Sequence, residues 1–288
     1  MNQLNLFIEL TRLKKPIGFM LLFWPCIWGL TIAYNFNSNL FNYFFFASLF
    51  LTGSILMRSA GCIINDIVDR NFDKKVERTK NRPIASGKVS VKLGLFYACV
   101  LCFLAFLVLI NFNYYTVGMA LISMPLAFSY PLMKRITYWP QLFLGITFNY
   151  GLVLAWISIA NEISIIPIIF YLGAIFWTLG YDTIYGFQDI KDDEIIGVKS
   201  TSIKFKSDPK RFLFISYFLF IASLVLIGIL MNFKNIYFLF MLLPIYHLFV
   251  FQIKKLDTSL ASDCLVKFKS NNFLGFLVLI NILIGKLI

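Results

Sequence analysis

The stretch CIINDIVDRNFDKKVERTKNRP, residues 62–83, joins an apolar run to a dense cluster of charged residues. The run before it, residues 41–64, is long enough for a membrane helix, which needs roughly 20 apolar residues. Asn65, Asp69 and Asp73 follow at positions i, i+4 and i+8, a spacing that places their side chains in one stripe along a helix. The sequence therefore predicts a line of polar side chains where a membrane helix leaves the bilayer.

The composition of the whole chain indicates an integral membrane protein. Of the 288 residues, 59% are hydrophobic and only 14% are charged, whereas soluble domains carry about 25% charged residues. Backbone groups find no water within a bilayer, so each apolar run is expected to cross as a helix. We predict an all-α, polytopic transmembrane helix bundle of about nine spans, at 16–35, 41–64, 93–111, 114–131, 139–160, 164–186, 212–231, 235–253 and 271–288. Eight spans are the alternative, because the fourth run is short and the boundary between the sixth and seventh runs is indistinct.

The basic residues predict the orientation of the bundle. The formal net charge is +12, and all of the 26 basic residues except Arg58, Lys234 and Lys286 fall on one side of the predicted spans. Cytoplasmic loops carry an excess of lysine and arginine, so the N-terminus and both long connections, 65–92 and 187–211, are expected to face the cytoplasm. The charge lies between apolar runs rather than on a soluble face, which argues against a nucleic-acid partner. Membrane lipid is the expected surrounding.

A single membrane domain is expected to span residues 1–288, because no soluble domain separates the apolar runs. Each half of the chain carries one acidic stretch after an apolar run, which is similar to the result of an internal duplication. Cys99 and Cys102 form a CxxC pattern inside an apolar run. The chain has no second such pair and only one histidine, which argues against a zinc or redox site.

A second acidic stretch, YDTIYGFQDIKDDEIIGVKST at 181–201, follows the sixth predicted span. Asp189 and Asp193 are again four residues apart, with Tyr185 one turn earlier and Asp182 near the same stripe. Like charges at this spacing repel each other, and the cost rises near the membrane. Two carboxylate stripes at one membrane face favour a shared hard cation such as Mg²⁺, and with it a phosphate-bearing substrate. The alternative is that these carboxylates are solvated charges that cap helices.

Several basic residues lie close to the acidic stretches and are candidates for binding phosphate groups. They are Arg70, Arg82, Lys134, Arg135 and Lys199. Most other basic residues are expected only to hold their loops on the cytoplasmic side. Arg58, inside the second predicted span, is costly in lipid and is expected to face the interior of the bundle.

The acidic residues match two signatures of a known enzyme superfamily. The first, NDxxDxxxD, is met by Asn65, Asp66, Asp69 and Asp73, and the second, DxxxD, is met by Asp189 and Asp193. On these residues the chain resembles the intramembrane aromatic prenyltransferase superfamily. Further likenesses lie in RLKKPIGFMLLFWPCIWGL (12–30), MRSAGCIINDIVDRNFD (57–73), NRPIASG (81–87), YPLMKR (130–135) and IGVKST (196–201). The patterns KPIG…WP, YPLMKR and YDTIYGFQD resemble more narrowly the 4-hydroxybenzoate branch, which serves ubiquinone synthesis.

The resemblance implies transfer of a polyprenyl chain from polyprenyl diphosphate to 4-hydroxybenzoate, at the ring carbon ortho to the hydroxyl. In the implied reaction Mg²⁺ polarises the diphosphate, whose loss leaves an allylic carbocation that the ring attacks. The implied holders of the metal are Asn65, Asp69, Asp73, Asp189 and Asp193. The apolar tail would lie in a groove between helices that opens to lipid. The expected location is the bacterial inner membrane, with the active site on the cytoplasmic side.

Further roles follow from the resemblance and from side-chain chemistry. Arg135 is the expected contact of the acceptor's carboxylate, because its planar guanidinium suits that geometry. Asp66 is expected to assist phenol or proton chemistry. These two residues and the four metal-binding aspartates form the predicted catalytic set. The predicted substrate-binding set is Arg70, Arg82, Lys134, Tyr185 and Lys199.

Two alternatives to this function stay open at the level of sequence. Sibling enzymes of the superfamily act on haem, menaquinone precursors, chlorophyllide or homogentisate, and the narrower patterns disfavour them. A divalent-cation transporter or channel would place acidic residues along a pathway in the middle of the membrane. The acidic residues here lie instead at the cytoplasmic ends of helices, among basic residues that suit phosphate.

Overall fold

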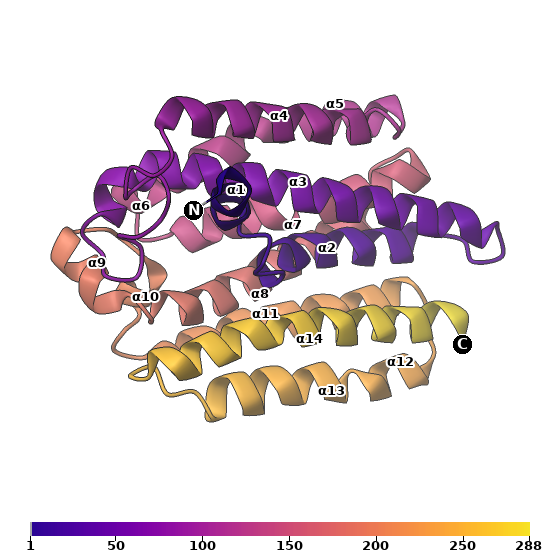
Figure 1. Cartoon of the computed structure of the whole chain (residues 1–288). Helices are drawn as coiled ribbons and strands as arrows, with labels where there is room; N and C mark the ends of the chain where they lie inside the picture. The colour runs from indigo at the N-terminus through magenta and orange to yellow at the C-terminus, as the bar shows by residue number, and fades with distance from the viewer. Residues whose placement is uncertain (1) are drawn as a thin grey trace.

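The computed structural model describes residues 2–288, in which helices joined by turns and loops are the only regular elements and no strand occurs (Figure 1). In chain order the helices are α1 (Gln3–Thr11), α2 (Ile17–Ala33), α3 (Leu40–Asp73), α4 (Val91–Leu109), α5 (Tyr114–Ser129), η1 (Tyr130–Leu132), α6 (Met133–Ile136), α7 (Pro140–Ala160), α8 (Ile165–Gly186), α9 (Ile190–Ile196), α10 (Thr201–Lys204), α11 (Pro209–Leu230), α12 (Asn235–Phe240), α13 (Leu242–Ile245), η2 (Tyr246–Lys254) and α14 (Ala261–Leu287). The predicted all-α bundle is confirmed.

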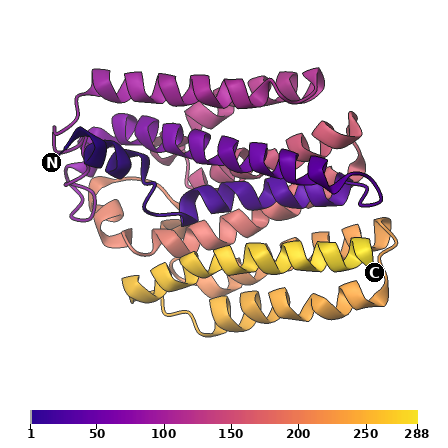
Figure 2. The ribbon, with the colours of Figure 1, turned by 45° about the vertical axis from the view of Figure 1, so that its right-hand side comes forward.

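The number of membrane crossings follows from the apolar helices and from the position of the two ends. Within residues 2–288, 8 helical segments are long and apolar enough to cross a membrane, and α2 is a shorter apolar helix of 17 residues. The N- and C-termini lie at opposite ends of the bundle (Figures 1 and 2). Opposite ends require an odd number of crossings. We therefore count α2 as a crossing, which agrees with the predicted nine rather than with eight.

Two helices extend well beyond their predicted apolar runs. α3 continues past residue 64 to Asp73, and α14 begins at Ala261 rather than at residue 271. Hydropathy marks where the apolar run ends, but a helix can continue wherever its charged residues are solvated or paired. The extension of α3 has a functional consequence. It carries Asn65, Asp66, Asp69 and Asp73, here named the first acidic motif, on a continuous helix.

The core of the bundle lies where α2, α8 and α11 meet. The ring of Trp28 lies 5.4 Å from that of Phe170 and 5.0 Å from that of Trp177. Phe220 of α11 completes the cluster, 5.9 Å from Trp177. The indole N–H of Trp28 donates to the carbonyl of Gly275 at 3.0 Å, which ties α14 to the same core. Aromatic stacking and this buried hydrogen bond hold the central helices in register.

Close packing at Gly29 provides a test of this arrangement. A Cβ atom at Gly29 would collide with the backbone carbonyl of Leu152, so α2 and α7 can approach this closely only because residue 29 has no side chain. We expect Gly29→Ala to force the helices apart, at a cost of about 1–3 kcal/mol, and to lower the thermal unfolding midpoint in detergent. Gly53→Ala is the matched control, since a Cβ there meets nothing within 4 Å. Equal midpoints for the two variants would show that α2 and α7 do not pack this closely.

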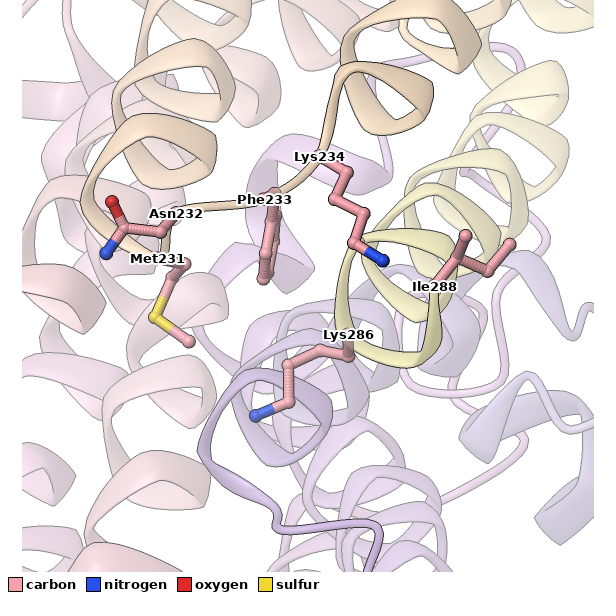
Figure 3. Close-up of a pocket in the computed structure, with 7 residues that line it drawn as sticks. Met231, Asn232, Phe233, Lys234, Lys286 and Ile288 are labelled. Atoms are coloured by element: carbon pink, nitrogen blue, oxygen red, sulfur yellow. The ribbon is translucent and has the colours of Figure 1, made fainter.

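The end of the bundle that holds the C-terminus has a pocket of about 350 Å³ beside the turn after α11 (Figure 3). Lys234 and Lys286, the two basic residues predicted to lie on the outer side, both line it. Nζ of Lys286 donates to the carbonyl of Ile32 at 3.0 Å and so satisfies the C-terminal end of α2. The N-terminal helix α1 and the last turns of α3 lie at the other end. The pocket is therefore separate from the acidic residues.

Candidate active site

The first acidic motif occupies the last turns of α3. Asp66, Asp69 and Asp73 are buried, with 2%, 1% and 6% of their surfaces exposed, and Asn65 is half-buried. The helix keeps these side chains in line, as their spacing predicts. Buried carboxylates are costly unless cations or hydrogen-bond donors surround them. The partners of each carboxylate therefore indicate which kind of ligand the site can bind.

Two arginines from distant parts of the chain pair with this motif. Arg12, which follows α1, donates from Nη2 to Oδ1 of Asp66 at 2.6 Å. Arg82, in the connection between α3 and α4, donates from Nη1 to Oδ1 of Asp66 at 3.1 Å and to Oδ2 of Asp73 at 2.9 Å. The structure thus brings the predicted Arg82 to the acidic residues. Arg12 was not predicted as a site residue, although it lies among basic residues just before the first span and begins the stretch 12–30 that resembles the superfamily.

Asp69 lies beside two basic residues of α6. Nζ of Lys134 is 2.6 Å from Oδ2 of Asp69, whereas Nη2 of Arg135 is 3.8 Å from Oδ1. The hydrogen bond of Arg135 goes instead to the carbonyl of Val68, at 2.7 Å. Within the described chain, Oδ1 of Asp69 is therefore buried without a hydrogen-bond donor. This oxygen thus lacks the donor or cation that a buried carboxylate oxygen usually has.

Asp189 and Asp193, here named the second acidic motif, lie where α8 gives way to the short helix α9. The two residues share a helical turn, since the amide of Asp193 donates to the carbonyl of Asp189 at 2.9 Å. The sequence predicted that Tyr185 lies on the same helical stripe as Asp189 and Asp193. This prediction is wrong, because the three residues do not share one continuous helix. α8 ends at Gly186, and the backbone of Asp189 (φ −113°, ψ 6°) is non-helical and begins α9. Tyr185 and Asp189 are held together by a side chain instead of by helical geometry.

That side chain is Arg78, from the connection between α3 and α4. Its Nε donates to both carboxylate oxygens of Asp189, at 2.7 and 3.0 Å, and its Nη2 also donates to Oδ2. Its Nη1 donates to the hydroxyl of Tyr185 at 3.2 Å. Arg78 was not among the predicted site residues, because several basic residues follow Asp73 and nothing local distinguishes it from them. Its contacts join the connection that follows the first motif to the second motif.

Asp193 is half-buried beside Asp189. Burial, and then the negative charge of Asp189, raise the pKa of Asp193 from 3.8 to about 6, against the opposing effect of Lys134. Lys134 also pairs with Asp69, so it acts on both acidic motifs. A cation placed between the motifs would relieve the repulsion that raises the pKa of Asp193.

The side chains of two predicted phosphate-binding residues do not pair with the acidic motifs. Arg70 is exposed, and no acidic residue of the described chain pairs with it. Neighbours at i and i+1 on a helix do not face the same way, so the adjacency of Arg70 to Asp69 is misleading. Nζ of Lys199 donates to the carbonyl of Ile136 at 3.1 Å and lies 5.6 Å from the centre of the Tyr138 ring. Lys199 therefore stabilises the connection after α9 instead of pairing with a carboxylate.

A polar cluster lies inside the bundle. Its members Arg58, Tyr130 and Asp182 are close enough to one another to interact electrostatically, and each is half-buried. Among residues 2–288, Arg58 has no acidic partner within 4 Å, and its Nε is buried without an acceptor. Arg12, the partner of Asp66, is close enough to Arg58 to interact electrostatically. Arg58 thus faces the interior, as predicted, and offers a hydrogen bond that the protein does not use.

The side-chain oxygens of the two acidic motifs suit Mg²⁺, although they do not form a complete metal site by themselves. No three Asp, Glu, His or Cys side chains of residues 2–288 lie close enough together to hold a metal ion. Mg²⁺ sites commonly use one or two carboxylates and complete the shell with water and substrate phosphates. Asp69 has an oxygen without a donor, and Asp193 has a raised pKa that a nearby cation would lower. Asp189 differs, because Arg78 engages both of its oxygens.

Comparison with known proteins gives a consistent result. The chain matches the UbiA prenyltransferase family over residues 22–279. The mitochondrial 4-hydroxybenzoate polyprenyltransferase of Rattus norvegicus is 42% identical over 282 residues, which cover 98% of this chain and 75% of the rat protein. 4-Hydroxybenzoate geranyltransferase 1 of Lithospermum erythrorhizon is 42% identical over 286 residues, covering 98% of this chain and 90% of the plant protein.

Solved structures share the fold. The apo structure of a UbiA homolog from Aeropyrum pernix K1 has a TM-score of 0.72 at 21% identity, and covers 93% of this chain and 96% of that chain. A UbiA homolog from Archaeoglobus fulgidus bound to DMAPP and Mg²⁺ has a TM-score of 0.65 at 18% identity, and covers 95% of this chain and 98% of that chain. The solved structures thus support the fold, and the sequence matches show that the chain is a prenyltransferase and belongs to the UbiA prenyltransferase family.

Proposed function

We propose that this enzyme uses Mg²⁺ to transfer a polyprenyl chain from polyprenyl diphosphate to 4-hydroxybenzoate, as a step of ubiquinone biosynthesis. The new carbon–carbon bond forms at the ring carbon ortho to the hydroxyl, while the donor's bond to diphosphate breaks and that ring carbon loses its proton. The observation that carries the proposal is the meeting of two acidic motifs and their arginine and lysine partners at one end of the bundle. The names of the rat and Lithospermum relatives support the acceptor, and the Archaeoglobus homolog bound to DMAPP and Mg²⁺ supports the donor class and the metal.

The diphosphate of the donor fits best between the two acidic motifs. The residues that would hold Mg²⁺ there are Asn65, Asp69, Asp73, Asp189 and Asp193. The bound ion would withdraw charge from the departing diphosphate. Arg82 and Lys134 already stand among the carboxylates of the first motif, where their N–H donors can also turn to phosphate oxygens. Tyr185 borders the same space through its contact with Arg78 and stays a proposed substrate contact.

The acceptor's carboxylate has two candidate partners, and the geometry favours the deeper one. Arg135 is exposed, donates to the carbonyl of Val68 and leans toward Asp69, which suits a position at the mouth of the site. Arg58 lies in the polar cluster inside the bundle, and its Nε donor is unused. A small aromatic acid bound beside this cluster would satisfy that donor and pair with the guanidinium. We therefore assign the acceptor's carboxylate to Arg58 and leave Arg135 a role near the diphosphate.

An apolar groove between α5, α7 and α8 offers a place for the prenyl tail. It has a volume of about 220 Å³, and its lining consists of Ile122, Ser123, Leu126, Ala127, Ile146, Thr147, Tyr150 and Tyr171. Ile122 exposes 72% of its surface, so the groove opens on the lipid side. Leu126 lies one helical turn before Tyr130, which belongs to the polar cluster around Arg58. A tail in this groove would therefore start close to the proposed site of reaction.

The proposed role of Arg58 leads to a kinetic prediction. Arg58→Gln should raise the KM for 4-hydroxybenzoate by about tenfold or more, because a charge-assisted contact to the acceptor is lost. The KM for the prenyl diphosphate should change little. Arg135→Gln is the comparison variant, and steady-state kinetics with each substrate varied in turn gives both constants. A tenfold rise in the KM for 4-hydroxybenzoate in Arg135→Gln, with no rise in Arg58→Gln, would show that Arg135 binds the acceptor's carboxylate instead.

The apolar helices and the family place the protein in a membrane, but the comparisons do not support the predicted bacterial inner membrane. The rat relative is named as a mitochondrial protein. The cytoplasmic position of the site stays a prediction that rests on the distribution of basic residues. Labelling of single cysteines introduced at Lys80 and at Lys234, with a reagent that does not cross membranes, would test the orientation.

Product analysis tests the proposed function. Purified protein in liposomes would receive labelled 4-hydroxybenzoate, polyprenyl diphosphates of several lengths and Mg²⁺, and the lipid product would be identified by mass spectrometry. We expect a prenylated 4-hydroxybenzoate substituted ortho to the hydroxyl. Product with homogentisate or another sibling acceptor, but none with 4-hydroxybenzoate, would replace the proposed acceptor. No product with any of these acceptors, from folded protein, would overturn the proposal.

A further inference from the structure

The ion pair between Arg78 and Asp189 has no part in the reaction as proposed above. The guanidinium donates to both oxygens of Asp189 and, through Nη1, to the hydroxyl of Tyr185 at 3.2 Å. It also lies over the Tyr185 ring, 5.6 Å from its centre. A two-point pair of this kind is directional and stronger than a single contact. Asp189 is therefore held in one orientation with both oxygens engaged.

The two acidic motifs differ in whether their carboxylate oxygens are already engaged by a hydrogen-bond donor. Asp69 keeps one oxygen without a donor, although Lys134 engages the other. Asp189 keeps neither, because Arg78 spans the carboxylate. A guanidinium that spans both oxygens and a Mg²⁺ ion on the same carboxylate repel each other and compete for its lone pairs. Binding of the ion at Asp189 is therefore expected to displace Arg78.

The side chain of Arg78 can leave its position without unfolding the surrounding connection. It is 41% exposed, whereas its neighbours Val76 and Thr79 are buried. The hydroxyl of Thr79 donates to the carbonyl of Asp73 at 3.0 Å and so anchors the connection to the end of α3. The backbone thus stays in place while the guanidinium is free to turn toward water.

We propose that Arg78 is a positioning residue that takes the place of the cation at Asp189 in the metal-free protein and gives way when Mg²⁺ binds. This inference rests on the proposed function, because it takes Asp189 as a holder of the metal. Arg78 keeps Asp189 and Tyr185 oriented before the ion arrives. It also neutralises a carboxylate that otherwise repels Asp193.

Binding of Mg²⁺ to the substrate-free protein tests this role without any turnover. Arg78→Ala should bind Mg²⁺ about tenfold more tightly than the wild type, since the ion no longer has to displace a charge-assisted pair. Lys80→Ala is the matched control. It removes one positive charge from the same connection, but Lys80 pairs only with the exposed Glu77, at 2.6 Å. The affinity of Lys80→Ala should therefore match that of the wild type.

Chemical labelling of arginines gives a second readout. Phenylglyoxal labelling, located by mass spectrometry, should increase at Arg78 when Mg²⁺ is added and stay constant at the exposed Arg70. Unchanged affinity in Arg78→Ala, with Arg78 labelled equally with and without Mg²⁺, would mean that the pair is only structural and would overturn the inference. An equal gain in Mg²⁺ affinity for Arg78→Ala and Lys80→Ala would show that only the loss of a positive charge matters, and would also overturn the inference.

These results separate the inference from the proposed function. Mg²⁺-dependent product formation by the wild type, together with unchanged affinity in Arg78→Ala, would leave the function standing and remove only the role of Arg78. Absence of Mg²⁺ binding in the wild type and in both variants would overturn the metal site and the inference together.

Discussion

Replacing Asp69 with asparagine should lower the turnover of prenyl transfer by about two to three orders of magnitude while the bundle stays folded. Asparagine keeps the size and shape of aspartate but lacks the negative charge that binds a cation. The change acts on a buried carboxylate whose Oδ1 has no donor in the described chain. Lys134, its partner, is 28% exposed and can turn to water, so the loss of the ion pair should cost little stability.

Turnover and thermal unfolding of the Asp69→Asn protein should be measured on one preparation, because a folding defect would also lower activity. Glu77→Gln is the matched control. Glu77 lies in the connection after the same motif, is 80% exposed and pairs only with Lys80. Turnover of folded Asp69→Asn within tenfold of the wild type would remove Asp69 from the set of metal-holding residues.

Asp189→Asn should produce a loss of similar size, about two to three orders of magnitude, from the other side of the site. This variant removes a proposed holder of Mg²⁺ and breaks the ion pair with Arg78. The arginine is 41% exposed, so the pair itself contributes little to folding and the loss should appear in turnover rather than in the unfolding midpoint. Unimpaired turnover of the folded variant would show that the second motif does not serve the metal.

The double variant Asp69→Asn/Asp189→Asn shows whether the two motifs act together. Residues that act as one unit are strongly non-additive, so removing both costs little more than removing one. We expect the turnover of the double variant to lie close to that of the less active of the two single variants. If the two single losses multiplied instead, the motifs would act independently and a shared metal would be excluded.

The spans could be predicted from the sequence because membrane crossing depends on local apolarity. The predicted runs correspond to the apolar helices of the structure. The start of α14 could not be predicted in the same way, because its first turns are charged and depend on tertiary contacts. Lys267 shows this: its Nζ lies 3.7 Å from the centre of the Phe251 ring and 3.5 Å from Asp263. Nothing near Lys267 in the sequence marks the ring as its partner.

The acidic motifs were easier to predict than their partners for a similar reason. Helical geometry relates positions that are close in sequence, so the alignment of the carboxylates on α3 follows from spacing alone. Arg12 and Arg78 reach carboxylates 54 and 111 positions away, a relation that no local pattern carries. Arg70 illustrates the opposite error, because a residue next to Asp69 in sequence points away from it on the helix. The suggested internal duplication stays a prediction.

Metal removal tests most directly the central claim, that the acidic motifs use Mg²⁺ to transfer a prenyl group. Wild-type protein in liposomes would be treated with a chelator, assayed with labelled 4-hydroxybenzoate and a polyprenyl diphosphate, and assayed again after Mg²⁺ is restored. We predict that the labelled lipid product disappears with the chelator and returns with Mg²⁺. Undiminished product formation by the chelator-treated protein would contradict the account, because the two acidic motifs would then hold no ion that the reaction needs.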